Sequence, residues 1–222
     1  MTQPYLSPFF VNALPLKLEK MVRESVAIAE KRIVKLLNIS RFINIIIANQ
    51  KSNTIPEMGI SGETLSDDLI IIYLDKRSNK ITQANLISMI AHEINHAQRW
   101  FLLPKFDNTL AGSLILEGLA CAFEQQINPH QPSFFIRTIS SRSSRNSEKI
   151  KAVFNKELFI DNFSWQKKRK VYFVSGNEKL KLPRWAGYQL GLYLVQNKIN
   201  SSGKKASELI SLPVNDFFNY IK

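Results

Sequence analysis

Two of the three histidines in this 222-residue chain lie four positions apart, in the segment MIAHEINHAQRW at residues 89–100. On an α-helix, residues at this spacing project from one face, so the imidazoles of His92 and His96 can share a metal ion. Glu93 lies about 100° further around such a helix, where it can reach a water molecule on the ion. The spacing therefore predicts a zinc centre with Glu93 as general base.

Histidines at this spacing also occur on helix surfaces without any metal, so the rest of the segment matters. Its apolar residues gather on the side opposite the histidines: Leu86, Ile90, Ile94, Ala97 and Phe101. A helix of this kind buries its apolar side in the core and presents the other side to a functional site. This pattern favours a metal site over a chance pair of surface histidines.

Zinc suits such a site because catalytic zinc takes three protein ligands and keeps one position open for water. The pKa of that water falls from about 15.7 towards about 7. A nearby glutamate then takes a proton as the water attacks a carbonyl, and passes it to the leaving amine. The predicted reaction is hydrolysis of a peptide bond.

The motif does not fix the third protein ligand. The extended pattern HExxHxxGxxH is absent, because Arg99 and Leu102 stand where it requires glycine and histidine. Glu117 is the strongest candidate, since its carboxylate lies in the otherwise apolar segment LILEGLACAFEQQ at 114–126. A carboxylate in such surroundings is costly unless it coordinates something.

Other residues stay open as the third ligand. Glu124 lies within about 20° of Glu117 on the helical wheel, so it is either a ligand or a group that orients a ligand histidine. Asp107 is a more remote option. His130 lies between Pro129 and Pro132 in an expected turn, where a surface histidine is the simpler interpretation.

Local signals predict the elements that carry these residues. Residues 83–102 are expected to form the helix with the motif, capped by Thr82, with Pro104 beyond its end. A second helix is expected over about 108–127, ended by Asn128 and Pro129. Gly118, Ala120 and Ala122 would let this second helix approach a neighbour closely.

The N-terminal part is predicted to contain one helix and two strands. Residues 16–37 carry apolar side chains at helical spacing, which predicts an amphipathic helix that Asn38 ends. FINIIIA (42–48) and LIIIYLD (69–75) are short and rich in β-branched residues, as buried strands are. The intervening residues 49–68 are rich in Gly, Ser, Asn and Asp, and are expected to be a long loop.

After residue 130 the signals are weaker. Residues 137–147 are Ser-rich and basic and are expected to form a mobile loop, and 148–159 are expected to be helical. KVYFV at 170–174 is interpreted as a strand or a strand-like turn. Residues 185–199 should form a helix that begins after Pro183.

The formal charge of +12 belongs to the C-terminal part of the chain. Residues 1–130 hold 13 Lys and Arg against 12 Asp and Glu, whereas later residues hold 17 against 6. Basic clusters stand at 137–149 (RTISSRSSRNSEK) and 166–170 (QKKRK), and such clusters attract acidic partners. Because they lack interleaved aromatic residues, we do not expect nucleic acid as a partner.

Cys121 is the only cysteine, so no intrachain disulfide can form, which suits a reducing compartment. The N-terminal stretch has no basic residue before its apolar part and contains three prolines, a pattern that fits a signal peptide poorly. No apolar run approaches the roughly 20 residues that span a bilayer. We therefore expect a cytoplasmic protein without a membrane span, and leave secretion open.

Three segments together resemble the predicted zinc-dependent proteases catalogued as domain of unknown function 2268: AHEINHAQRW, LEGLACAFE, and LPRWAGYQLGLYLV at 182–195. MGISGETLSDDLIIIYLD at 58–75 resembles that family's glycine-containing segment before the active helix, so the likeness spans roughly residues 55–215. The basic clusters at 137–149 and 166–170 depart from the family pattern and leave the choice of substrate open.

The resemblance implies a zincin-like fold in the gluzincin manner. It implies that His92, His96 and Glu117 hold zinc and that Glu93 is catalytic. The substrate would be a peptide or a protein.

The segment at 182–195 also offers a donor to the oxygen that becomes negatively charged during attack, a role that Tyr, His or Arg takes in metallopeptidases. We select Tyr188 over Arg184, although a core aromatic and a surface charge are the simpler interpretations. The strand at 69–75 would bind an extended peptide by strand addition if it formed the sheet edge, and would be a core strand otherwise.

We predict an α+β, zincin-like metallopeptidase fold, with a small mixed sheet over the HExxH helix and a helical C-terminal part. It would form a single domain over 1–222, with an N-terminal helical extension at 1–40 and a basic, mainly helical part at 131–222. The competing hypothesis is a non-catalytic zinc-binding module whose basic surface binds an acidic partner or nucleic acid.

Overall fold

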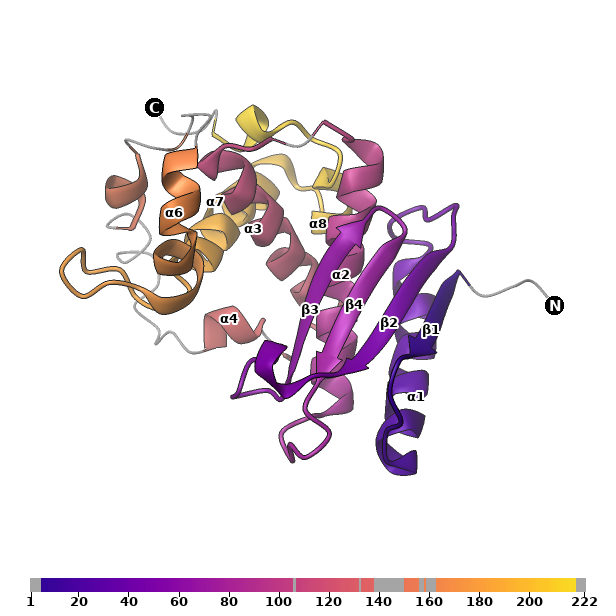
Figure 1. Cartoon of the computed structure of the whole chain (residues 1–222). Helices are drawn as coiled ribbons and strands as arrows, with labels where there is room; N and C mark the ends of the chain where they lie inside the picture. Colours follow the sequence, from indigo (N-terminus) through magenta and orange to yellow (C-terminus); the bar gives the residue numbers. More distant parts are fainter. Residues whose placement is uncertain are drawn as a thin grey trace. The chain divides into compact units, whose positions relative to one another are not determined.

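The computed structural model of the chain describes residues 5–105, 107–131, 133–137, 150–155, 158 and 163–218 (Figure 1). The chain forms two compact units: Met1–Pro104 with Phe123–Gln131, and Lys105–Ala122 with Pro132–Lys222. Helix α3 (Leu110–Ile127) contributes residues to both. The single domain over 1–222 stays a prediction.

A four-stranded mixed sheet lies in the first unit. Its strand order is β1 (Leu6–Phe10), β2 (Ile43–Asn49), β4 (Leu69–Leu74) and β3 (Ile60–Ser66). The first three strands are parallel, and β3 pairs with β4 in the antiparallel direction. The predicted small mixed sheet is therefore confirmed, with β2 and β4 as its two predicted strands.

Two helices pack on one side of this sheet (Figure 1). Helix α2 (Gln83–Leu102) contacts β3 and β4, while α1 (Leu16–Ile33) contacts β1 and α2. Alternate residues of β2 and β4 are at most 1% exposed and form the core: Ile43, Ile45, Ile47, Ile70, Ile72 and Leu74. This alternation is the burial pattern of strands that bury one face of a sheet.

Helices α2 and α3 end where local signals placed them, whereas α1 ends at Ile33, four residues before the predicted end, and residues 34–38 form a turn. Asn38, which was expected to end the first helix, has φ 50°, in the left-handed region that asparagine tolerates. Thr82 caps α2, because its side-chain oxygen accepts from the backbone N–H of Asn85 at 3.2 Å. Helix α3 ends at Ile127, immediately before the predicted stop.

Both edge strands were missed. Residues 49–68 were expected to be a loop, but Ile60–Ser66 form β3, whose sequence ISGETLS has no run of apolar residues. The expected helical extension at 1–40 also contains β1. Strand β1 pairs with β2, which is remote in sequence, and β3 is itself weakly patterned, although its partner β4 follows directly. Local signals therefore did not reveal them.

The strand at 69–75 was left open as a sheet edge or a core strand. It is a core strand, because β4 pairs with β2 on one side and β3 on the other. One further expectation is corrected. Val171–Ser175, expected to be strand-like, forms a π-helical turn after α6 (Phe163–Lys170). Its β-branched residues are typical of strands, but strand propensity depends strongly on context. Here the segment packs against α6 and α7 as a helical turn.

Helix α7 (Ala186–Ser202) is the central element of the second unit and confirms the helix expected over 185–199. It contacts α4 (Phe134–Arg137), the turn Val171–Ser175 and α8 (Ala206–Leu209). Residues 150–154, within the segment expected to be helical, are also helical. Residues 138–147 of the expected loop lie outside the described residues.

Within the second unit, α7 and the N-terminal part of α3 touch backbone to backbone. A Cβ atom on Gly118 would lie 2.2 Å from the carbonyl oxygen of Gly191, and one on Gly191 would lie 2.1 Å from the carbonyl oxygen of Leu114. Neither position has room for a side chain. The expected close approach of a neighbouring helix is therefore confirmed at Gly118, the residue beside Glu117.

We predict that Gly191→Ala lowers the free energy of unfolding by about 1–3 kcal/mol, because the added methyl forces the two helices apart. In an uncrowded helix, alanine would instead stabilise by roughly 0.5–1 kcal/mol. Denaturant unfolding measures the sign directly. Ser201→Ala, at an exposed position of the same helix, is the control and should not destabilise. A stabilised Gly191→Ala protein would contradict the backbone contact.

Candidate active site

Helix α2 places the motif as its sequence predicted, with one exception. His92 and Glu93 are 3% and 4% exposed, and His96 is half-buried. On the opposite side, the predicted apolar residues Leu86, Ile90, Ile94 and Ala97 are fully buried. Phe101 was expected with them but is 44% exposed. It lies in the last turn of the helix, where the guanidinium of Arg41 stands 4.2 Å from its ring centre.

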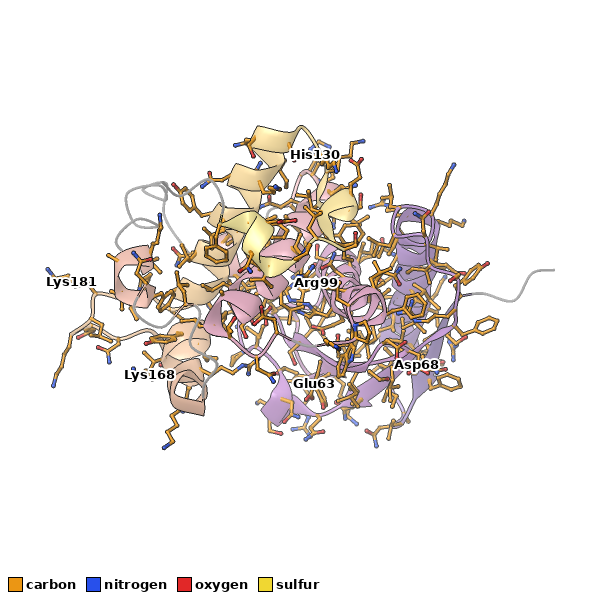
Figure 2. All side chains as sticks on the ribbon, turned by 90° about the horizontal axis from the view of Figure 1, so that it is seen from above. Glu63, Asp68, Arg99, His130, Lys168 and Lys181 are labelled. Atoms are coloured by element: carbon orange, nitrogen blue, oxygen red, sulfur yellow. The ribbon has the colours of Figure 1, made fainter. Side chains whose placement is uncertain are left out.

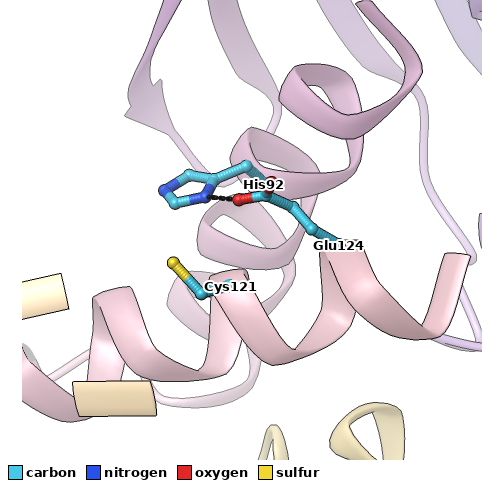
Figure 3. A group of neighbouring side chains, drawn as sticks. All are labelled: His92, Cys121 and Glu124. Atoms are coloured by element: carbon cyan, nitrogen blue, oxygen red, sulfur yellow. Dashed lines mark hydrogen bonds and ion pairs between the residues drawn. The ribbon is translucent and has the colours of Figure 1, made fainter. Parts of the chain in front are cut away.

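His92 forms a short hydrogen bond with Glu124. Its Nδ1 atom lies 2.6 Å from Oε1 of Glu124, and both side chains are about 5% exposed or less (Figure 3). An ionised carboxylate only accepts hydrogen bonds, so the proton belongs on Nδ1 and the Nε2 atom carries the lone pair. This is the arrangement in which a histidine ligates a metal through Nε2 while a carboxylate orients its ring.

Two groups of described side chains bring three possible ligand atoms within 4.8 Å of one another. One group is His92, His96 and Glu117, and the other is His92, Cys121 and Glu124. The imidazoles of His92 and His96 meet edge to face, with ring centres 4.6 Å apart. Two imidazole nitrogens and one carboxylate oxygen are a donor set that catalytic zinc takes, so the first group fits that ion.

The second group suits a metal less well. Two ligand atoms on a tetrahedral zinc, each about 2.05 Å from the ion, stand about 3.3 Å apart. The 2.6 Å between His92 and Glu124 is shorter than this and is the length of a charge-assisted hydrogen bond. Cys121 also accepts from the hydroxyl of Ser133 at 3.5 Å. The geometry therefore favours Glu124 as the group that orients His92.

Strand β3 holds the carboxylate of Glu93. The hydroxyl oxygen of Thr64 lies 2.8 Å from Oε2 of Glu93 and 3.0 Å from its backbone oxygen. Two residues earlier, a Cβ atom on Gly62 would lie 2.4 Å from Cγ of Glu93. Glu63, between them, is exposed on the other face of the sheet (Figure 2). The buried carboxylate is thus packed directly against the inner face of β3.

The remaining ligand candidates belong to neither group. His130 is exposed in the turn after α3 (Figure 2), as the surface interpretation expected. Asp107 accepts from the backbone N–H and the hydroxyl of Thr109, at 2.9 and 2.5 Å, just before α3 begins. Its carboxylate therefore organises the start of that helix.

Tyr188 lies in an aromatic cluster of the second unit. Its ring stacks on Phe135 with ring centres 3.9 Å apart, and Phe173 and Trp185 meet it edge to face. Arg184 is exposed and lies over the ring of Trp185. Ring packing accounts for the aromatic body of Tyr188, and its role as an oxyanion donor stays a prediction.

Three residues of the site were not anticipated as part of it: Gly62, Thr64 and Cys121. The first two were hidden because their strand was taken for a loop. Cys121 carried a usable signal, since it stands four residues after Glu117 and three before Glu124. These spacings place all three on one face of α3.

The family model of the predicted Zn-dependent proteases (domain of unknown function 2268) matches residues 17–219. The chain belongs to this family. The predicted resemblance is confirmed, and the family description supports zinc and protease chemistry at this coarse level. No curated protein and no solved structure matches the chain. No helix within the described residues is long and apolar enough to cross a membrane.

Proposed function

We propose that this family member is a zinc-dependent metallopeptidase of the gluzincin type, with a zincin-like fold. His92, His96 and Glu117 hold the ion, and Glu93 is the general base. The observation that carries the proposal is that Glu93 is buried and held in place on the same helix as two of the three donors. A glutamate so held is suited to receive a proton.

The proposed mechanism divides the work among these residues. His92, His96 and Glu117 would hold the zinc ion, which would supply a Lewis acid for the peptide carbonyl and for a water molecule. Glu93 accepts a proton from the attacking water and returns it to the leaving amine. Glu124 keeps the imidazole of His92 in one tautomer and orientation. Tyr188 donates to the carbonyl oxygen as negative charge develops there.

An extended peptide would bind along β3 by strand addition. Among the described residues, β3 is the edge strand beside β4, and only its first residue, Ile60, forms a further bridge, with Ile55. The rest of its outer edge has backbone groups available for pairing. Because its inner face contacts Glu93, a peptide on that edge would run past the general base. This role was considered for the strand at 69–75 on the condition that it formed the sheet edge, but that strand lies inside the sheet.

The second candidate function is a non-catalytic zinc-binding module that docks an acidic partner. The exposed residues Lys167–Lys170 of α6, together with Lys179 and Lys181, favour it (Figure 2 labels Lys168 and Lys181). Such a module has no use for a buried, positioned glutamate beside its metal ligands. We therefore place peptide hydrolysis first, and the following variants distinguish the two functions.

We predict that Glu93→Gln retains zinc but lowers kcat on a peptide library by about 10²–10⁴-fold, because the amide cannot accept the proton. His92→Ala should lose both zinc and activity. Metal analysis and peptide hydrolysis are measured on the same preparations, with the parent as reference. Hydrolysis by Glu93→Gln at the parent rate would remove the catalytic assignment. A zinc-loaded parent that cleaves no peptide would favour the docking module.

We predict that Glu117→Ala weakens zinc binding far more than Glu124→Ala. Loss of a direct ligand removes a bond to the ion, whereas loss of an orienting carboxylate costs about 10–100-fold in metal affinity. Competition with a chelator gives both affinities. Gln125→Ala, on the same helix, is the control and should bind zinc like the parent. The reverse order of effects would make Glu124 the ligand.

We predict that Tyr188→Phe lowers kcat by about 10²-fold and leaves KM and zinc content near the parent values, because only the hydroxyl is lost. The phenylalanine ring keeps the stacking on Phe135, so the unfolding midpoint should change little. Steady-state kinetics measure the effect. An unchanged kcat would assign Tyr188 to the aromatic core alone.

A further inference from the structure

Gly62 and Thr64 contact the general base from a strand that supplies none of the three proposed ligands. They stand two apart on β3, so their side-chain positions share one face, and that face meets α2. The pairing with β4 shifts register between Thr64 and Ser66, as it does at a β-bulge. Bulges of this kind redirect side chains and are frequent beside active sites.

We propose that Gly62 and Thr64 form a cradle that fixes the carboxylate of Glu93 for proton transfer. The inference rests on the proposed role of Glu93 as general base. Thr64 is a positioning residue: it acts through Glu93 and needs no contact with the peptide or the ion. Gly62 supplies the space that the carboxylate occupies.

The hydroxyl of Thr64 is the anchor. It has one proton and two acceptors within reach, Oε2 of Glu93 at 2.8 Å and the backbone oxygen of Glu93 at 3.0 Å. The carboxylate is nearer and charged, and charge-assisted hydrogen bonds are about twice as strong as neutral ones. Because the backbone oxygen belongs to the same residue, the hydroxyl ties the carboxylate to its own helix and to β3.

Gly62 limits the position of the Glu93 carboxylate on the side of Oε1. A Cβ atom there would lie 2.5 Å from Oε1 and 2.4 Å from Cγ of Glu93, well inside van der Waals contact. The carboxylate therefore lies flat against the strand backbone. With Thr64 at one oxygen and Gly62 at the other, a glutamate with freely rotating bonds is confined to one position. Confinement matters because a misplacement of 1 Å can cost about 10²-fold in rate.

The test compares Thr64→Val, which keeps the shape of the side chain and removes the hydroxyl, with Thr64→Ser, which keeps the hydroxyl. In the zinc-loaded enzyme, Thr64→Val should lower kcat by about 10–100-fold while KM and zinc content stay near the parent values. Thr64→Ser should restore most of the rate. Thr54→Val removes a hydroxyl by the same substitution at a partly exposed position outside β3, and is the matched control, expected to match the parent.

Crystal structures of these variants give a readout independent of activity. The carboxylate of Glu93 should move in Thr64→Val and return to its place in Thr64→Ser. Gly62→Ala should also displace it and lower kcat with zinc retained, and this variant decides the matter if Thr64→Val fails to fold.

Three results overturn the cradle: an unchanged kcat in Thr64→Val, an effect confined to KM, or an unmoved Glu93 carboxylate. If the parent cleaves no peptide, the proposed function fails instead. In that case the crystal structures of the variants still show whether Gly62 and Thr64 fix the carboxylate of Glu93.

Discussion

The hydrogen bond between His92 and Glu124 is the constraint on which the site depends. Burying an ionised carboxylate costs several kcal/mol unless it is paired and hydrogen-bonded, and Glu124 is only 4% exposed. Its partner at 2.6 Å meets that requirement and fixes the ring of His92. Since α3 is continuous, Glu117 leaves the same face about 10 Å further along its axis.

The helices and the metal-binding motif were predictable because their signals are local. The signals for α2 all lie within about 20 residues of sequence: a cap at Thr82, an apolar stripe and a histidine pair. All three fit the periodicity of a single helix. Glu117 could also be selected as a candidate third ligand, because a carboxylate inside an apolar helix is costly unless something pairs with it. The sequence did not decide which of Glu117 and Glu124 is the metal ligand and which orients a histidine. Only the distance from Glu124 to His92 separates an orienting residue from a ligand.

The part that escaped prediction is the part whose signals are not local. Strand β3 contains Gly62, an exposed glutamate and two serines, so it lacks the alternation of a strand with one buried face. On its inner face Ile60 joins the apolar core, but Gly62 and Thr64 meet Glu93. The feature that makes the strand useful to the site is thus the feature that hid it. For the same reason the sequence did not decide whether the strand at 69–75 was the sheet edge or a core strand.

Close packing explains why small residues gather around the site. Gly118 meets α7 where no side chain fits, and Gly62 meets Glu93 in the same way within the other unit. Each glycine lets a backbone approach a neighbour and lowers the helical or strand propensity of its own segment. A site that only stored zinc would need a fixed ligand set and no more. A buried Glu93, anchored by a hydroxyl and given room by a glycine, carries additional costs in stability. Those costs are understandable if the carboxylate must exchange a proton at a fixed point, which is why the arrangement favours a catalyst over a binding module.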